Sequence, residues 1–267
     1  MNILSRNDVR VIGDGPRVLL YAHGFGCNKA MWDQITPAFA STHRQIIFDY
    51  VGSGNSDLTA FDPQKYSYLS GYAQDLLEVC DALDLHGDVS LVAHSVSCSI
   101  GLLAAIQRSS LFDKLVLLGP NPCFLNVPPD YQGGFERDDL EGLLDLMDQN
   151  YMGWADYLAP VVSGEDGGVR VSNQLSESFC STDPVAARIF AKATFFSDNR
   201  SDLANVRTPA LILQHRYDAL APLAVGTYMH KHLPSSTLKV LDVKGHCAHL
   251  SNPQLVIDAM RTYLQAC

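Results

Sequence analysis

The sequence predicts an α/β protein built on a doubly wound, mostly parallel sheet, with a cap of four helices inserted between two strands. Three observations lead to this fold class. Short runs rich in Val, Ile and Leu recur without polar alternation, as expected for parallel strands that are buried on both faces. Segments with helical periodicity lie between these runs. One long internal stretch shows helical periodicity alone.

The predicted strands set the order of the core. An edge strand is expected at residues 9–12. Buried strands are expected at residues 18–21, 45–48, 89–92, 114–118, 210–213 and 238–243. The helices of the core are expected at residues 68–85, 96–106, 221–233 and 253–264. Strands and helices therefore alternate, which is typical of a parallel sheet with helices on both faces.

The stretch from residue 123 to residue 206 interrupts this alternation. Four helices are expected there, at residues 135–148, 151–162, 171–179 and 184–196. Asp183 before Pro184 predicts the start of the last one, with a capping side chain ahead of proline at the first helical position. We therefore expect an α/β core of residues 1–122 and 207–267 and a helical cap of residues 123–206. Such a cap would act as a lid over a ligand crevice at the carboxyl ends of the strands.

Composition and charge exclude several classes of function. Hydrophobic residues make up 47% of the chain and charged residues 18%, which is typical of a globular protein. The formal net charge of −10 argues against a nucleic-acid partner, because phosphate contacts favour a basic face. No apolar run reaches about 18 residues, so no membrane span is expected. Residues 1–6 do not begin a signal peptide, and we therefore expect a cytoplasmic protein.

The cysteines and histidines predict neither disulfides nor a metal site. The cysteines are odd in number and form no Cys-x-x-Cys pair, which favours reduced thiols. A metal site needs clustered ligands, and the close histidine pairs are His230 with His232 and His246 with His249. The glycines at 52 and 54 lack the spacing of a dinucleotide-binding loop. No metal or cofactor is expected. The seven cysteines are Cys27, Cys80, Cys98, Cys123, Cys180, Cys247 and Cys267.

The strongest candidate for chemistry is Ser95, which lies between a predicted strand and a predicted helix. The nucleophile-elbow pattern Gly-x-Ser-x-Gly places a serine on a strained turn at such a junction. Ala93 and Ser97 replace the two glycines, and both are small enough for strand and helix to pack closely. The alternative is that Ser95 is an ordinary helix N-cap.

Two further residues follow other predicted strands at their carboxyl ends. Asp218 comes after the strand at 210–213, and His246 comes after the strand at 238–243. The chain order Ser, Asp, His and the common sheet edge predict a catalytic triad of Ser95, Asp218 and His246. His246 would accept the serine proton, and Asp218 would fix the tautomer of the imidazole.

Other residues near these positions could take the same roles. His249 could replace His246, and Asp242 could replace Asp218. Asp242 lies inside a predicted strand and His249 near the last helix, so both are interpreted as structural. His94 is expected to line a pocket or to pack.

A Gly-rich loop follows the first buried strand, in the string Ala-His-Gly-Phe-Gly at 22–26. Acyl transfer needs N–H donors that face the developing oxyanion. In folds with a nucleophile elbow, one donor comes from the loop after an early strand and the other from the residue after the nucleophile. We therefore expect the oxyanion hole to be formed by the backbone N–H groups of Phe25 and Val96. The alternative is a turn without function.

Longer strings in the chain match those of one known group. They are His-Gly-Phe-Gly-Cys at 23–27, Asp-Tyr-Val-Gly-Ser-Gly at 49–54, His-Ser-Val-Ser at 94–97, Asn-Tyr-x-Gly-Trp at 150–154, Phe-Cys-Ser-Thr-Asp-Pro at 179–184 and Gly-His-Cys-x-His at 245–249. With them the chain resembles the RsbQ-type α/β hydrolases over essentially its whole length. That group is also similar to the plant karrikin and strigolactone receptors, which often carry Gly-His-Ser-Val-Ser, so that Ala93 is the clearer departure.

The resemblance implies a small hydrophobic ligand or substrate, and a protein partner. RsbQ-type proteins act with a PAS-domain phosphatase in a bacterial stress response. The resemblance also implies an apolar pocket under the cap. The candidates to line it are Phe25, Phe124, Phe135, Trp154, Phe190 and Phe195, although each could instead pack cap against core.

The favoured hypothesis is a slow serine hydrolase of small hydrophobic esters or lactones that serves as a ligand-sensing regulator. One alternative is a metabolic carboxylesterase without a signalling partner. Another is a non-catalytic sensor, motivated by the replaced elbow glycines. A haloalkane dehalogenase is less favoured, because that chemistry needs Asp where Ser95 stands.

Overall fold

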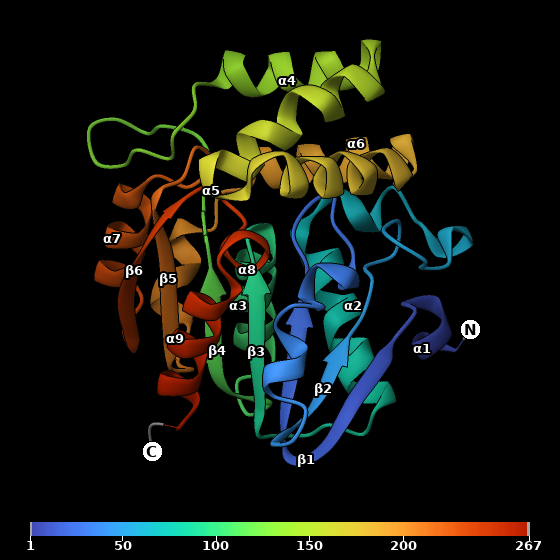
Figure 1. Cartoon of the computed structure of the whole chain (residues 1–267), viewed down its shortest axis with the longest axis vertical. Helices are drawn as coiled ribbons and strands as arrows, with labels where there is room; N and C mark the ends of the chain where they lie inside the picture. The colour runs from blue at the N-terminus through green and yellow to red at the C-terminus, as the bar shows by residue number, and fades with distance from the viewer. Residues whose placement is uncertain (1, 266–267) are drawn as a thin grey trace.

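The computed structural model describes residues 2–265, which fold around one six-stranded sheet (Figure 1). Its strands are β1 (Arg10–Ala22), β2 (His43–Ile47), β3 (Val89–His94), β4 (Phe112–Leu118), β5 (Ala210–Tyr217) and β6 (Ser236–Lys244). They lie in the order β2-β1-β3-β4-β5-β6. Neighbouring strands pair in parallel. The predicted mostly parallel sheet is therefore confirmed.

Strand β1 differs from its prediction, because the expected edge strand at 9–12 and the expected strand at 18–21 are parts of one element. Val18 to Tyr21 lie opposite Arg44 to Ile47 in ascending order, whereas Arg10 to Ile12 lie opposite Ile47 to Gln45 in descending order. The chain therefore bends around the start of β2 (Figure 1). Gly13 makes this bend possible with a φ of 75°, and a Cβ there would lie 2.5 Å from the Ala40 carbonyl oxygen.

Helices cover both faces of the sheet, as the doubly wound prediction requires. Leu91 and Leu117 belong to the apolar cluster that includes α2 (Leu69–Ala82), α3 (Val96–Gln107) and α7 (Leu223–His232). Val92 and Val116 belong to the opposite cluster, which includes α8 (Ala248–Ser251) and α9 (Pro253–Gln265). The shorter elements are α1 (Ile3–Arg6), η1 (Lys29–Trp32), η2 (Thr36–Ala38), η3 (Leu58–Ala60), η4 (Lys65–Ser67) and η5 (Arg200–Asn205).

Three helical elements lie between β4 and β5, above the carboxyl ends of the strands (Figure 1). They are α4 (Arg137–Gln149), α5 (Tyr151–Ser181) and α6 (Pro184–Phe195). Gly164 and Gly168 have non-helical backbone angles and divide α5 into two arms, which correspond to the two helices expected there. The start of α6 is as predicted, because the Asp183 side chain accepts hydrogen bonds from the N–H groups of Val185 and Ala186. Within residues 2–265, no helix is both long and apolar enough to cross a membrane.

Candidate active site

Ser95 lies on a strained turn between β3 and α3. Its φ of 58° and ψ of −126° are rare for a residue with a side chain. Its side chain makes no capping hydrogen bond to the helix. The interpretation of Ser95 as an ordinary N-cap is therefore wrong, and the turn leaves the hydroxyl directed away from the helix backbone.

Small residues around Ser95 allow α3 to pack closely on the sheet. Ala93 and Ser97 are both fully buried. Ser97 Oγ donates to the carbonyl oxygen of His23 and lies 3.1 Å from the hydroxyl of Tyr50. Four residues after Ser97, a Cβ at Gly101 would lie 2.5 Å from Leu91 Cδ2. Gly101 therefore contributes to this close packing, while the hydroxyl of Ser97 ties the elbow to the loop after β1.

The loops after β3, β5 and β6 bring Ser95, Asp218 and His246 together. His246 Nε2 lies 2.8 Å from Ser95 Oγ, and His246 Nδ1 lies 2.7 Å from Asp218 Oδ2. The other carboxylate oxygen of Asp218 accepts from the N–H groups of Leu220, at 2.9 Å, and Ala221, at 3.1 Å. Burial acts to raise the pKa of Asp218, but the interactions with His246 and the neighbouring His215 hold that pKa well below its usual value. The carboxylate is therefore ionised and is positioned to fix the Nδ1–H tautomer of His246.

The alternative residues occupy other environments. Asp242 is exposed and pairs with Arg216 at 3.0 Å, so it cannot replace Asp218. His249 is buried against Trp32, with a ring-centroid distance of 5.0 Å. Within the described chain, neither ring nitrogen of His249 has a hydrogen-bond partner. His249 is therefore not the imidazole that meets Ser95.

His94 contributes to the geometry of the site, whereas the sequence predicted only a pocket or packing role. Its Nε2 lies 3.1 Å from the carbonyl oxygen of His246, to which it donates, and its ring also lines the cavity. Burial, followed by the neighbouring imidazoles of His249 and His246, lowers the pKa of His94 well below its usual value. A neutral His94 therefore connects the loop that carries His246 to the residue before Ser95.

The loop after β1 carries the first predicted oxyanion donor. His23 fixes this loop, because its Nδ1 donates to the Gly24 carbonyl at 2.9 Å and its Nε2 accepts from the Tyr50 N–H at 3.2 Å. A Cβ at Gly24 would lie 2.6 Å from His94 Nδ1, so the loop and the elbow are in close contact. Among residues 2–265, neither Phe25 N–H nor Val96 N–H donates to a protein acceptor. Both groups are therefore available to an acceptor on a ligand.

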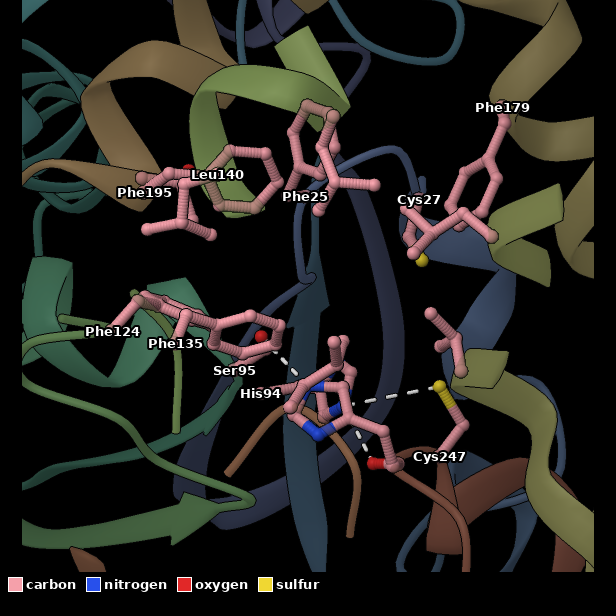
Figure 2. Close-up of a pocket in the computed structure, with 16 residues that line it drawn as sticks. Phe25, Cys27, His94, Ser95, Phe124, Phe135, Leu140, Phe179, Phe195 and Cys247 are labelled. Atoms are coloured by element: carbon pink, nitrogen blue, oxygen red, sulfur yellow. Dashed lines mark hydrogen bonds between the residues drawn. The ribbon is translucent and has the colours of Figure 1, made fainter. Parts of the chain in front are cut away.

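An apolar cavity lies between the core and the cap, with Ser95 in its wall (Figure 2). His246 also lines it. Of the predicted residues, Phe25, Phe124, Phe135 and Phe195 line it. His94, expected to line a pocket or to pack, lines it as well. The sequence did not predict the remaining lining residues, which are Cys27, Leu140, Leu143, Leu158, Val162, Phe179, Thr194, Leu220 and Cys247. Burial raises the pKa of the Cys27 thiol to about 12. The thiols are therefore neutral, and the cavity favours uncharged, apolar ligands.

Two of the predicted pocket residues do not line the cavity. Trp154 is fully buried and packs on Tyr151 and Phe179, with ring-centroid distances of 5.4 Å to each. Phe190 stacks on Tyr72 at 4.0 Å. Both rings contact the ring of Phe25, at 5.9 Å for Trp154 and 5.6 Å for Phe190. They therefore support the cavity wall from behind.

The fold also brings together histidine and cysteine side chains that are scattered in the sequence. His94, Cys247 and His249 form one buried group, and His215, Asp218 and His246 form another, each with its ligand atoms within 4.8 Å of one another. Possible metal ligands therefore do cluster in the folded chain, contrary to the prediction from their positions in the sequence. The hydrogen bonds that His94, Asp218 and His246 make within the protein account for their positions without an ion.

A protein-family model described as the alpha/beta hydrolase family matches residues 19–259. The chain belongs to this family. It is 38% identical to the probable esterase D14L of Oryza sativa subsp. japonica, an alignment that covers 97% of this chain and 96% of that protein. It is 36% identical to the strigolactone esterase D14 of Arabidopsis thaliana, over 98% of both chains. It is 34% identical to the karrikin insensitive 2 receptor CA of Petunia hybrida, over 97% of this chain and 95% of that protein.

Solved structures of other alpha/beta hydrolases have the same fold. A hydrolase from Oleispira antarctica superimposes with a TM-score of 0.97 and 46% identity, over 100% of this chain and 97% of that one. These comparisons confirm the α/β-hydrolase fold and the resemblance to the plant receptors. The esterase names among the relatives support the sequence-based prediction of a carboxylic ester hydrolase.

Proposed function

We propose that the protein is a serine hydrolase with Ser95 as nucleophile, His246 as general base and Asp218 as the group that orients the base. The observation that supports this most strongly is the chain of hydrogen bonds that joins these three side chains over 2.8 and 2.7 Å. A serine hydroxyl is a weak nucleophile at neutral pH, and an adjacent imidazole activates it by accepting its proton. The strained backbone of Ser95 also holds its hydroxyl in the cavity wall.

The reaction consists of two transfers of an acyl group. Ser95 Oγ attacks the carbonyl carbon of the ester while His246 Nε2 accepts the hydroxyl proton. The imidazolium gives this proton to the departing alkoxide, and the acyl group remains as an ester on Ser95. Water then attacks that ester with His246 again as base, which releases the acid and restores the serine. The N–H groups of Phe25 and Val96 would donate to the oxyanion in both steps.

The substrate we propose is a small uncharged ester or lactone. Phenylalanine and leucine side chains form most of the cavity wall, and no Asp, Glu, Lys or Arg of the described chain contributes to it. A carboxylate or ammonium group on the ligand would lose its hydration there without gaining a partner. We assign the chemistry to a core of residues 1–122 and 207–267, and the shape of the substrate site largely to a cap of residues 123–206.

We further propose that this chemistry is slow and serves signalling. The resemblance to RsbQ-type hydrolases and the karrikin receptor among the relatives support this role. The partner would be a PAS-domain phosphatase of a stress response that contacts the outer face of the cap. This assignment of a partner rests on family analogy.

The experiment is a time course with a chromogenic short-chain ester, using wild type, Ser95→Ala and Ser99→Ala. Ser99 is a matched control, because it is a buried serine on the same helix that donates to the Asn121 carbonyl. We expect Ser95→Ala to lose at least about a thousandfold in rate. We expect Ser99→Ala to retain the wild-type rate.

The shape of the time course separates the functions. A burst of one equivalent that then stalls supports the slow sensor. Steady turnover that depends on Ser95 supports a metabolic carboxylesterase. Ligand-dependent stabilisation of a wild type without turnover supports the non-catalytic sensor, and equal activity of Ser95→Ala and wild type contradicts the proposed nucleophile.

A further inference from the structure

His215 is a second imidazole at the carboxylate of Asp218, outside the catalytic triad. It lies on β5 and is fully buried. Its Nδ1 is 3.3 Å from Asp218 Oδ2, the same oxygen that His246 Nδ1 approaches to 2.7 Å. The centroids of the two imidazole rings are 6.4 Å apart. A Cβ at Gly119, the residue after β4, would lie 3.2 Å from His246 Cε1 and 3.4 Å from His215 Cε1, so Gly119 lies against both rings.

The position of Asp218 determines which nitrogen of His215 carries the proton. Within the described residues, neither ring nitrogen of His215 makes an aligned hydrogen bond, and Asp218 Oδ2 lies 3.3 Å from its Nδ1. A lone pair on Nδ1 would face the ionised carboxylate and be repelled by it, whereas an N–H would be attracted. Nδ1 therefore carries the proton. The carboxylate then faces four N–H groups, two from imidazoles and two from the backbone of Leu220 and Ala221.

The other titratable groups near His215 are imidazoles. His94 from β3 and His249 from α8 both interact electrostatically with it. Burial, as the largest cause, lowers the pKa of both residues well below its usual value, so they are neutral at neutral pH. Asp218 is therefore the charged group that faces His215, and the influence of His215 on the site acts through that carboxylate.

We propose that His215 is a positioning residue that shares the carboxylate of Asp218 with His246 and thereby sets the pH range in which His246 acts as base. An imidazolium at His246 is stabilised by the negative charge of Asp218. A second N–H donor at the same oxygen shares the negative charge of the carboxylate and so weakens that stabilisation. The site then retains its free base, and its activity, in more acidic solution. This inference rests on the proposed function of His246.

The test compares His215→Leu, His215→Asn and wild type in the pH dependence of kcat/KM on a chromogenic ester. Leucine removes the donor at nearly constant volume, whereas the amide nitrogen of asparagine occupies nearly the position of Nδ1. We expect His215→Leu to move the acid limb of the profile upward by about 0.5 to 1 pH unit, because a donor to a carboxylate is lost. Its rate at pH 6 relative to pH 8 then falls several-fold. KM stays unchanged because His215 does not line the cavity, and His215→Asn keeps the wild-type limb.

His249→Leu is the matched control, since it removes another buried imidazole that has no carboxylate partner among the described residues. An equal shift in His249→Leu, or an unchanged acid limb in folded His215→Leu, overturns the proposal. If His215→Leu does not fold, His215→Asn is used instead. The second measurement is then an NMR titration of the His246 ring in wild type and in folded His215→Asn. If the His246 ring in His215→Asn titrates as in wild type, the proposal is supported. If its pKa rises by the amount expected for the loss of a donor, the proposal is contradicted. This titration needs no turnover, so its result is separate from the outcome for Ser95→Ala.

Discussion

The two walls of the cavity are built on different physical principles. On the core side, directional hydrogen bonds of 2.7 and 2.8 Å fix Asp218, His246 and Ser95 at the ends of rigid strands. On the cap side, side chains such as Phe135, from the loop before α4, and Phe195, from α6, meet the cavity through apolar contact alone (Figure 2). Reacting groups need fixed geometry, whereas apolar walls can repack around different ligands. The comparison suggests that chemistry is fixed by the core and that ligand choice is adjustable in the cap.

A backbone hydrogen bond joins the cap to the loop that carries the base. The His246 N–H donates to the Val162 carbonyl of α5 at 2.9 Å, so the cap helix holds the loop of the base. The kink at Gly164 lies against Gly245, where a Cβ would be 2.2 Å from the Ser163 carbonyl oxygen. A displaced cap therefore disturbs the polar wall as well.

The largest effect we expect is at this junction. Gly245→Ala should lower the free energy of unfolding by about 2 to 4 kcal/mol, because the φ of 145° and the contact with the backbone of Ser163 both exclude a side chain. Urea unfolding followed by circular dichroism measures the loss. Gly142→Ala is the control, since a Cβ there meets nothing within 4 Å and alanine favours its helix. Equal stability of the two variants would show that cap and core are not joined here.

An intermediate effect is expected at the apolar wall. Phe135→Ala should raise KM by about tenfold and leave kcat within about threefold, because the ring lines the cavity and would contact the proposed substrate away from the reacting atoms. Phe190→Ala should instead lower stability, since that ring packs on Tyr72 behind the wall. Steady-state kinetics with the same ester measure Phe135→Ala, and urea unfolding measures the stability of Phe190→Ala. A fall in kcat of Phe135→Ala without a change in KM would contradict the assignment of chemistry to the core and ligand choice to the cap.

The smallest effect concerns the polar wall and pH. The pKa of Asp218 is lower in the folded chain than in the unfolded chain, so its ionised form stabilises the fold above about pH 4. As the pH falls through the unfolded value toward the folded one, this contribution is lost, by about 1 kcal/mol between pH 5 and pH 3. Unfolding of wild type and Asp218→Asn across this range measures it. The difference in stability between the two should shrink toward low pH, and a constant difference contradicts the assignment.

The sequence predicted features that depend on local pattern or on the ends of strands. The buried strands were visible as apolar runs, and Ser95, Asp218 and His246 each follow a different strand, which is why their meeting could be predicted. The bend of β1 around β2 was missed. The pattern of residues 9–21 predicts strand, but it does not reveal that the first and last parts of β1 pair with β2 in opposite directions. His215 was missed because its approach to Asp218 depends on the turn after β5.

The cap was predicted less well than the core. Its helices could be expected from periodicity, but not which of their faces meets the cavity. Trp154 and Phe190 were therefore expected at the cavity and lie behind it, while Leu140 and Phe179 were overlooked. Cys27 and Cys247 are far apart in the sequence and follow strands that are not neighbours in the sheet. Their common place in the cavity wall depends on the paths of the loops after β1 and β6, which the sequence does not reveal.

Gly101 has a consequence for the recognition of distant relatives. The absent side chain that lets α3 rest on β3 is one helical turn beyond the position where the usual elbow pattern requires it. A search rule that demands glycine on both sides of the serine rejects this chain, although its backbone makes the same turn. A rule that accepts any small residue two positions before and after the serine would retain this chain. The rule would also ask for one glycine on the sheet-facing side of the first two turns of the following helix. Hydrolases that lack the two-glycine signature can then be found by the close packing of helix on strand that the two glycines usually allow.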